Sequence, residues 1–205
     1  ITTFAVISSV AGASLSPMIS VILGVANIVA DGFSMAVSNY LKAKSDIEEL
    51  EKAIAEESRE IDLIPEGERE EIRQIYIKKG FEEGQLLEQV VGVITKNKKQ
   101  WIETMLVDEL GLRLNSANPF KAGLITFIAF CSMGIIPLLP FFFIHSQANF
   151  ELFLYSCITT SVNFVLLGVS KGIVLKRSVI KSVLETLFIG ASASALAFLL
   201  GHLTK

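Results

Sequence analysis

Residues Asn27–Asp46 read NIVADGFSMAVSNYLKAKSD, and this stretch decides how the chain is organised. Its first half is apolar except for Asn27 and Asp31, whereas its second half leads into a long acidic segment. No proline and only one glycine interrupt it, so we expect one continuous helix that leaves a lipid bilayer and enters water. An ionisable group such as Asp31 inside a membrane helix indicates a functional site, because a charge is costly there.

The charged residues of the 205-residue chain are segregated into one segment. Of the 21 Asp and Glu residues, 18 lie between Asp46 and Glu109. The remainder is almost uncharged, and the mean hydropathy of the whole chain is +0.55. The pattern predicts an all-α, polytopic membrane protein with a helical insert, divided into residues 1–45, 46–118 and 119–205.

Five apolar segments are candidates for membrane spans, each of which needs about 20 residues. The first is short, and we expect it to be cut at its start, with no signal peptide. Pro137 and Pro140 are expected to kink or end the third. The five expected spans are Ile1–Leu15, Met18–Leu41, Ala122–Ile144, Leu152–Ser170 and Val179–Leu200.

The insert between the second and third spans is expected to consist of four helices. Acidic and apolar residues recur at helical spacing over Asp46–Asp62. Pro65 is predicted to end that helix and to begin the next, because proline disfavours helix at the residue before it. Gly80 and Gly111 are predicted to end the second and fourth helices.

Basic residues indicate which side of the membrane the insert occupies. The link between the last two spans is basic, whereas the link His145–Glu151 has no Lys or Arg. The positive-inside rule therefore places the basic link, and by counting back the insert, in the cytoplasm. Glu185 in the fifth span is expected to pair with Lys181, four residues earlier.

Three pairs in the insert share a helix face by their spacing. Crowded carboxylates raise one another's pKa unless a cation neutralises them. Carboxylates with a thioether suit Fe²⁺ or Mn²⁺ better than a structural zinc. The simpler alternative is a solvated acidic face. The pairs are Glu57 with Glu60, Glu68 with Glu71, and Met105 with Glu109.

A polar stripe on the second span is a second candidate site. Asn27, Asp31, Met35 and Asn39 recur every fourth residue and so share one side of a helix. The stripe favours an ion path lined by Asn27, Asp31 and Met35. In the alternative interpretation, Asp31 pairs with a buried polar group and Met35 fills the core.

Four segments resemble, in order, the vacuolar iron transporter family: ITTFAVISSVAGAS, GVANIVADGFSMAVSNYLKAKSD, PEGEREEIRQIYIKKGF and WIETMLVDELGL. The resemblance implies a homodimer in a lipid bilayer that moves Fe²⁺, and often Mn²⁺, out of the cytoplasm in exchange for protons. Met35 falls on the family's pore methionine. The resemblance also implies that the cytoplasmic insert collects metal on Glu57, Glu60, Glu68, Glu71, Met105 and Glu109.

Some positions depart from the pattern of the family. The family's pore Asp lies just before the position where this sequence starts. Asn27 stands where some members have a pore Glu, and Asp31, one turn further on, is expected to substitute for it. Leu106 stands where some members have a second Met.

The sequence therefore predicts a transporter and not an enzyme, in a prokaryotic plasma membrane or a vacuolar-type membrane. The metal ion is its cargo, and no organic cofactor or nucleic-acid partner is expected. The alternative is a membrane protein that senses or buffers divalent ions without translocating them. A di-iron oxidase is disfavoured because the chain has no Glu-x-x-His pair. Cys131 and Cys157 are expected to be packed thiols, because no CxxC spacing exists.

Overall fold

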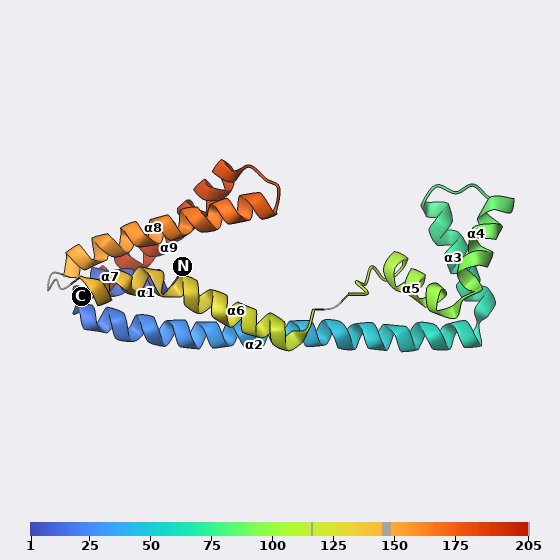
Figure 1. Ribbon diagram of the computed structural model, residues 1–205, viewed down its shortest axis with the longest axis horizontal. Coiled ribbons are helices and arrows are strands. Elements are labelled where there is room, and N and C mark those ends of the chain that lie inside the picture. The colour runs from blue at the N-terminus through green and yellow to red at the C-terminus, as the bar shows by residue number, and fades with distance from the viewer. Residues whose placement is uncertain (116, 145–148, 205) are drawn as a thin grey trace. The chain divides into compact units, whose positions relative to one another are not determined.

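The computed structural model describes residues 1–115, 117–144 and 149–204, and its regular elements are all helices (Figure 1). The predicted link His145–Glu151 lies partly outside the described residues. The chain divides into two compact units: unit 1 comprises Ile1–Ser38 and Gly123–Lys205, and unit 2 comprises Asn39–Ala122. The predicted insert, residues 46–118, falls within unit 2.

Helix α2 runs without a break from Pro17 to Leu63 and contributes to both units. The prediction of one continuous helix through Asn27–Asp46 is therefore confirmed. The helix begins at a proline, whose missing N–H costs nothing in a first turn. It ends before Ile64, which leaves the helical conformation at φ −134° because Pro65 follows it.

Unit 1 holds the apolar helices. Four segments are long and apolar enough to cross a membrane, namely Pro17–Leu63, Pro119–Phe143, Phe150–Val174 and Val179–Leu203. The segment predicted as the first span is an 11-residue helix, α1, so its role as a span stays a prediction. The helices are α1 (Thr2–Gly12), the first part of α2, α6 (Pro119–Gly134), η1 (Ile136–Leu138), α7 (Leu139–Phe143), α8 (Asn149–Val174) and α9 (Val179–Leu203).

Prolines break the third predicted span, as expected. Helix α6 ends at Gly134, and Pro137 and Pro140 lie in the first turns of η1 and α7. A proline inside a helix removes a hydrogen bond and clashes with the preceding turn. The hydroxyl of Ser156 on α8 donates to the backbone oxygen of Pro137 at 2.7 Å, which satisfies a carbonyl at the break.

Glycines allow α1 and α9 to approach backbone to backbone. A Cβ atom at Gly12 would lie 2.1 Å from the backbone oxygen of Phe198, and one at Gly201 would lie 2.0 Å from the backbone oxygen of Ser9. Both distances are far below van der Waals contact. Small residues are the usual means by which membrane helices come this close.

Helices α8 and α9 also meet at glycines, and this contact corrects one prediction. A Cβ atom at Gly168 would lie 2.6 Å from the Cα of Val183. Because the two helices lie so close, Lys171 of α8 reaches Glu185 of α9 with an N–O distance of 2.8 Å. The predicted pairing of Glu185 with Lys181 within one helix is wrong.

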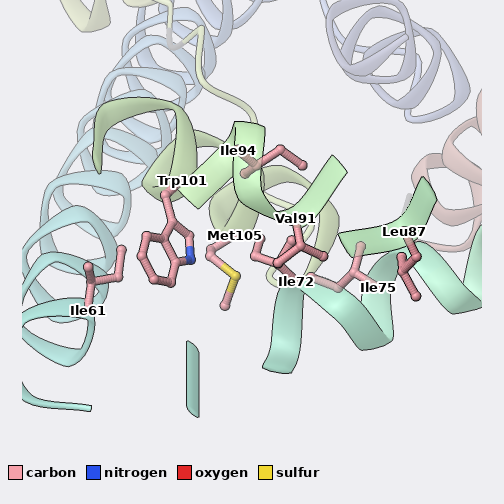
Figure 2. Packing of buried hydrophobic residues seen from close by; sticks show 8 residues of the cluster. All are labelled: Ile61, Ile72, Ile75, Leu87, Val91, Ile94, Trp101 and Met105. Atoms are coloured by element: carbon pink, nitrogen blue, oxygen red, sulfur yellow. The ribbon is translucent and has the colours of Figure 1, made fainter. Parts of the chain in front are cut away.

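Unit 2 contains the second part of α2 together with α3 (Pro65–Lys78), α4 (Gln85–Thr95) and α5 (Lys98–Asp108). Their apolar faces meet in one hydrophobic cluster (Figure 2). Burying each large aliphatic side chain contributes about 1.5–3 kcal/mol, so the cluster is the main stabilising term of unit 2. Its members are Ile61, Ile72, Ile75, Leu87, Val91, Ile94, Trp101 and Met105.

Ion pairs and glycine turns complete unit 2. Gly80 and Gly111 adopt positive φ values of 99° and 66° just after α3 and α5, which confirms the two predicted helix ends. Surface ion pairs contribute at most about 1 kcal/mol each, so they orient the helices more than they stabilise them. The pairs between helices or their caps are Arg73–Glu88 at 2.7 Å, Lys79–Asp108 at 2.5 Å and Lys98–Asp62 at 2.6 Å.

The two cysteines are free, as predicted. Cys131 lies on α6 and Cys157 on α8, and each is half-buried. Neither lies in a CxxC motif. They act as small packed side chains.

Substituting Gly201 with alanine is expected to destabilise the protein by about 1–3 kcal/mol, because the new Cβ overlaps the backbone of α1. Thermal unfolding in detergent, with size-exclusion chromatography to measure the folded fraction after heating, gives the change. The control is Gly92→Ala in α4, where a Cβ would meet only the end of the Arg69 side chain at 3.8 Å. Equal unfolding temperatures for wild type and Gly201→Ala would contradict the backbone contact.

Candidate metal-binding site

Five glutamates from three helices gather in unit 2. Glu57 and Glu60 lie on α2, Glu68 and Glu71 lie on α3, and Glu109 is the C-cap of α5. The charge of each of the other four raises the pKa of Glu57, so the five carboxylates share one electrostatic neighbourhood. We call this group the glutamate cluster.

The hydrophobic cluster of unit 2 brings these glutamates together. Ile61 comes from the end of α2, Ile72 from α3 and Met105 from α5, and the three pack into the same core. The i, i+3 spacing predicted that two glutamates share a face within α2 and two within α3. The packing of the helices then joins the pairs, which spacing alone does not predict.

Two of the five carboxylates are removed from water. The side chains of Glu57 and Glu68 are only 6% and 2% exposed. In each, the Oε2 atom has no hydrogen-bond partner within the described part of the chain. A buried carboxylate without a partner is costly when ionised, so these two side chains form the centre of the candidate site.

Burial and repulsion both raise the pKa of these central carboxylates. Burial is the larger cause for Glu57, followed by the charges of the other cluster members, and its pKa rises from 4.5 to about 7. The same causes raise the pKa of Glu68 from 4.5 to about 7. Burial and neighbouring glutamates also raise the pKa of Glu109, against the opposing charge of Lys78. Near neutral pH the cluster therefore holds protons that a cation can displace.

The carboxylates lie close together but do not form a ready coordination shell. Within residues 1–115, 117–144 and 149–204, no three His, Cys, Asp or Glu side chains are arranged to hold one metal ion. The two findings are compatible, because charges influence one another over longer distances than those of metal coordination. To bind one divalent ion together, these carboxylates would have to move closer to one another.

Met105 lies in the hydrophobic cluster and is 0% exposed. Figure 2 shows its side chain beside Trp101. The thioether therefore fills the core of unit 2, and its predicted role as a metal ligand stays a prediction. The indole N–H of Trp101 is also buried without a partner in the described chain. The sequence analysis did not single out Trp101, although it is the only Trp of the chain.

The polar stripe on α2 does not face one common environment. The Asn27 side-chain amide donates to the hydroxyls of Thr2 and Thr3 on α1, at 3.3 and 3.4 Å. Asp31 is half-buried, whereas Met35 is 49% exposed. The fourth member of the stripe, Asn39, belongs to unit 2. Within one chain, the predicted path is therefore half-buried at Asn27 and Asp31 and exposed at Met35.

Two buried polar residues in α8 were missed by sequence reasoning. Thr160 is 1% exposed and Asn163 is 4% exposed. They lie three residues apart and so share one helix face. The signal was present in the polar run TTSVN at 159–163, inside an otherwise apolar segment.

The raised pKa values make the stability of the metal-free protein depend on pH. Between about pH 4.5 and 7 the folded protein binds more protons at Glu57 and Glu68 than the unfolded chain does, so stability falls as pH rises through this window. Urea unfolding of unit 2, followed by Trp101 fluorescence, should show this fall. The fall in stability should be smaller in the double variant Glu57→Gln/Glu68→Gln and unchanged in the control variant Glu51→Gln, whose side chain is exposed in the wild type. A flat profile in the wild type would argue against raised pKa values.

Comparison with known proteins places the chain in a family. The family description "VIT family" matches residues 1–202. A vacuolar iron transporter of Centaurea cyanus is 34% identical over 95% of this chain and 79% of its own length. A vacuolar iron transporter of Toxoplasma gondii is 31% identical over 100% and 70%, and vacuolar iron transporter 1 of Arabidopsis thaliana is 31% identical over 98% and 80%. The chain belongs to the VIT family, as its resemblance to vacuolar iron transporters had indicated.

Proposed function

We propose that this protein exports Fe²⁺, and also Mn²⁺, from the cytoplasm in exchange for protons. The observation that carries the proposal is the glutamate cluster, whose buried carboxylates have only other carboxylates as the charged groups that shift their pKa. The relatives named vacuolar iron transporter support iron as the cargo. The four helices long and apolar enough to cross a membrane support a membrane location.

In this proposal, unit 2 lies in the cytoplasm and collects metal. Binding requires ionised carboxylates, so a metal ion that enters the cluster releases protons from Glu57 and Glu68. Glu60, Glu71 and Glu109 are more exposed and supply further oxygen ligands at the rim. Met105 would add a soft sulfur ligand, which suits Fe²⁺ better than Mg²⁺ or Ca²⁺.

The metal ion then enters a path that includes Asn27, Asp31 and Met35. A carboxylate, an amide oxygen and a thioether offer three successive ligands on one side of α2. Metal binding requires ionised carboxylates, so protonation of metal-binding carboxylates releases the ion. This competition is the physical basis that we propose for the exchange of metal for protons.

We also propose that two copies form a homodimer through α2. Met35 is 49% exposed in a single chain, and many large apolar side chains elsewhere on α2 are exposed as well. A second copy that covers Met35 would close the open side of the path. The exposed apolar residues of α2 include Met18, Ile22, Val25, Val29 and Phe33.

Removing the cluster should weaken metal binding. The fourfold variant with Ala at Glu57, Glu60, Glu68 and Glu71 is expected to bind Mn²⁺ at least about tenfold more weakly, a loss of about 1.4 kcal/mol. Isothermal titration calorimetry of the purified protein measures it. The control changes Glu48, Glu49, Glu51 and Glu66 to Ala, which removes the same charge outside the cluster. Equal affinities for both variants would refute the proposed site.

Changing Met35 to leucine should impair metal uptake more than folding, because it keeps an apolar side chain and removes the sulfur ligand. Uptake of Fe²⁺ and Mn²⁺ into proteoliposomes measures the effect, with Met18→Leu as the control on the same helix. Equal uptake by Met35→Leu and the wild type would count against the path. A wild-type protein that binds metal but never accumulates it in vesicles would instead be a sensor or buffer.

A further inference from the structure

The connection between α8 and α9 carries most of the positive charge of unit 1. Four of the five Lys and Arg residues in the sequence of this unit lie within residues 171–181, which we call the basic tip. The four are Lys171, Lys176, Arg177 and Lys181, and all of them are exposed. Glu185 is the only Asp or Glu between residues 171 and 185, so this part of the chain is net positive.

Most of this charge has no counter-charge in contact with it. Lys171 pairs with Glu185 at an N–O distance of 2.8 Å. Within the described residues, no ion pair includes Lys176, Arg177 or Lys181. The charge of Arg177 also acts on Glu185, but one carboxylate cannot neutralise four cations. The basic tip therefore attracts an anion from outside the chain.

The backbone holds two of these cations in a fixed turn. Helix α8 ends in a Schellman motif, in which the N–H of Arg177 donates to the backbone oxygen of Gly172 at 3.0 Å and that of Lys176 to Ile173 at 3.2 Å. Lys176 has a φ of 51° at the position where this motif usually has glycine. A left-handed conformation is unfavourable for a residue with a Cβ. The turn thus keeps an ammonium group where the backbone alone would favour glycine.

Exposed apolar side chains flank the basic tip and favour a lipid over a soluble anion. Val174 is 78% exposed, Ile180 is 72% exposed and Leu184 is 61% exposed. They belong to α8 and α9, both of which are long and apolar enough to cross a membrane. The cations therefore lie at the ends of two candidate spans, at the level where the polar headgroups border the hydrocarbon core.

We propose that the basic tip binds the phosphate group of an anionic phospholipid. Lys176, Arg177 and Lys181 supply the positive charge, and the guanidinium group can donate two parallel hydrogen bonds to phosphate oxygens. Lys171 stays paired with Glu185 and links α8 to α9 beside the site. The flanking apolar side chains contact the acyl chains. This binding does not depend on whether the glutamate cluster takes up a metal ion.

Native mass spectrometry of the protein in nonionic detergent tests the proposal by counting bound lipids. Phosphatidylglycerol and phosphatidylcholine with the same acyl chains are added separately. Each cation near an anionic lipid surface strengthens association roughly fivefold, so phosphatidylglycerol is expected to bind at least about tenfold more tightly. Equal binding of the two lipids would overturn the proposal. Displacement of phosphatidylglycerol by an equal concentration of glycerol phosphate would also overturn it, because the site would then be one for soluble phosphate.

Changing Lys176, Arg177 and Lys181 together to glutamine is expected to abolish the preference for phosphatidylglycerol. The control removes the same charge from exposed positions in unit 2 and should keep the preference. A preference that survives in the first variant, or that is lost equally in both, would contradict a site at the basic tip. The control substitutions are Lys52→Gln, Arg59→Gln and Lys96→Gln.

The single variant Lys176→Gly separates lipid binding from folding. Glycine adopts the left-handed conformation without strain, so the unfolding temperature in detergent should be unchanged or higher. Phosphatidylglycerol should nevertheless bind roughly fivefold more weakly, because one cation is lost. Unchanged binding, or a lower unfolding temperature, would overturn the role assigned to the charge of Lys176.

Discussion

The close approach of Glu57 and Glu68, buried beside further carboxylates, is the constraint on which the arrangement of unit 2 depends. Every charge that shifts the pKa of either residue is negative. When they are ionised, the carboxylates of the glutamate cluster repel one another and would push the ends of α2, α3 and α5 apart. The hydrophobic cluster opposes this repulsion, because the same three helices bury Ile61, Ile72 and Met105 against one another. Protons or a bound cation remove the repulsion, so occupancy of the site and packing of unit 2 are linked.

Much of the fold follows from local sequence signals. Proline and glycine mark helix ends through their backbone geometry, and Pro65, Gly80 and Pro137 did so in the predicted places. The unbroken α2 follows from the lack of any such signal through Asn27–Asp46. The prediction that was wrong concerned an interaction between two helices. The partner of Glu185 depends on how closely α8 approaches α9 at Gly168, which one-dimensional spacing does not encode.

The candidate sites were predictable to different degrees. Helical spacing pairs Glu57 with Glu60 and Glu68 with Glu71, but only tertiary packing shows that Glu57 and Glu68 are the buried members. The stripe on α2 reads as one line in sequence, although its ends meet different surroundings: α1 at Asn27 and unit 2 at Asn39. Burial, which sequence predicts poorly for polar groups, distinguishes these cases.

The position of Met105 has a consequence for how long unit 2 survives in an oxidising setting. Oxidation turns a methionine thioether into a polar sulfoxide, which disrupts a packed core. Because Met105 is 0% exposed, the packed helices of unit 2 shield its sulfur from a soluble oxidant. The hydrophobic cluster that brings the glutamates together thus also protects the Met105 sulfur. Oxidation of this sulfur would disrupt the cluster and separate the glutamates.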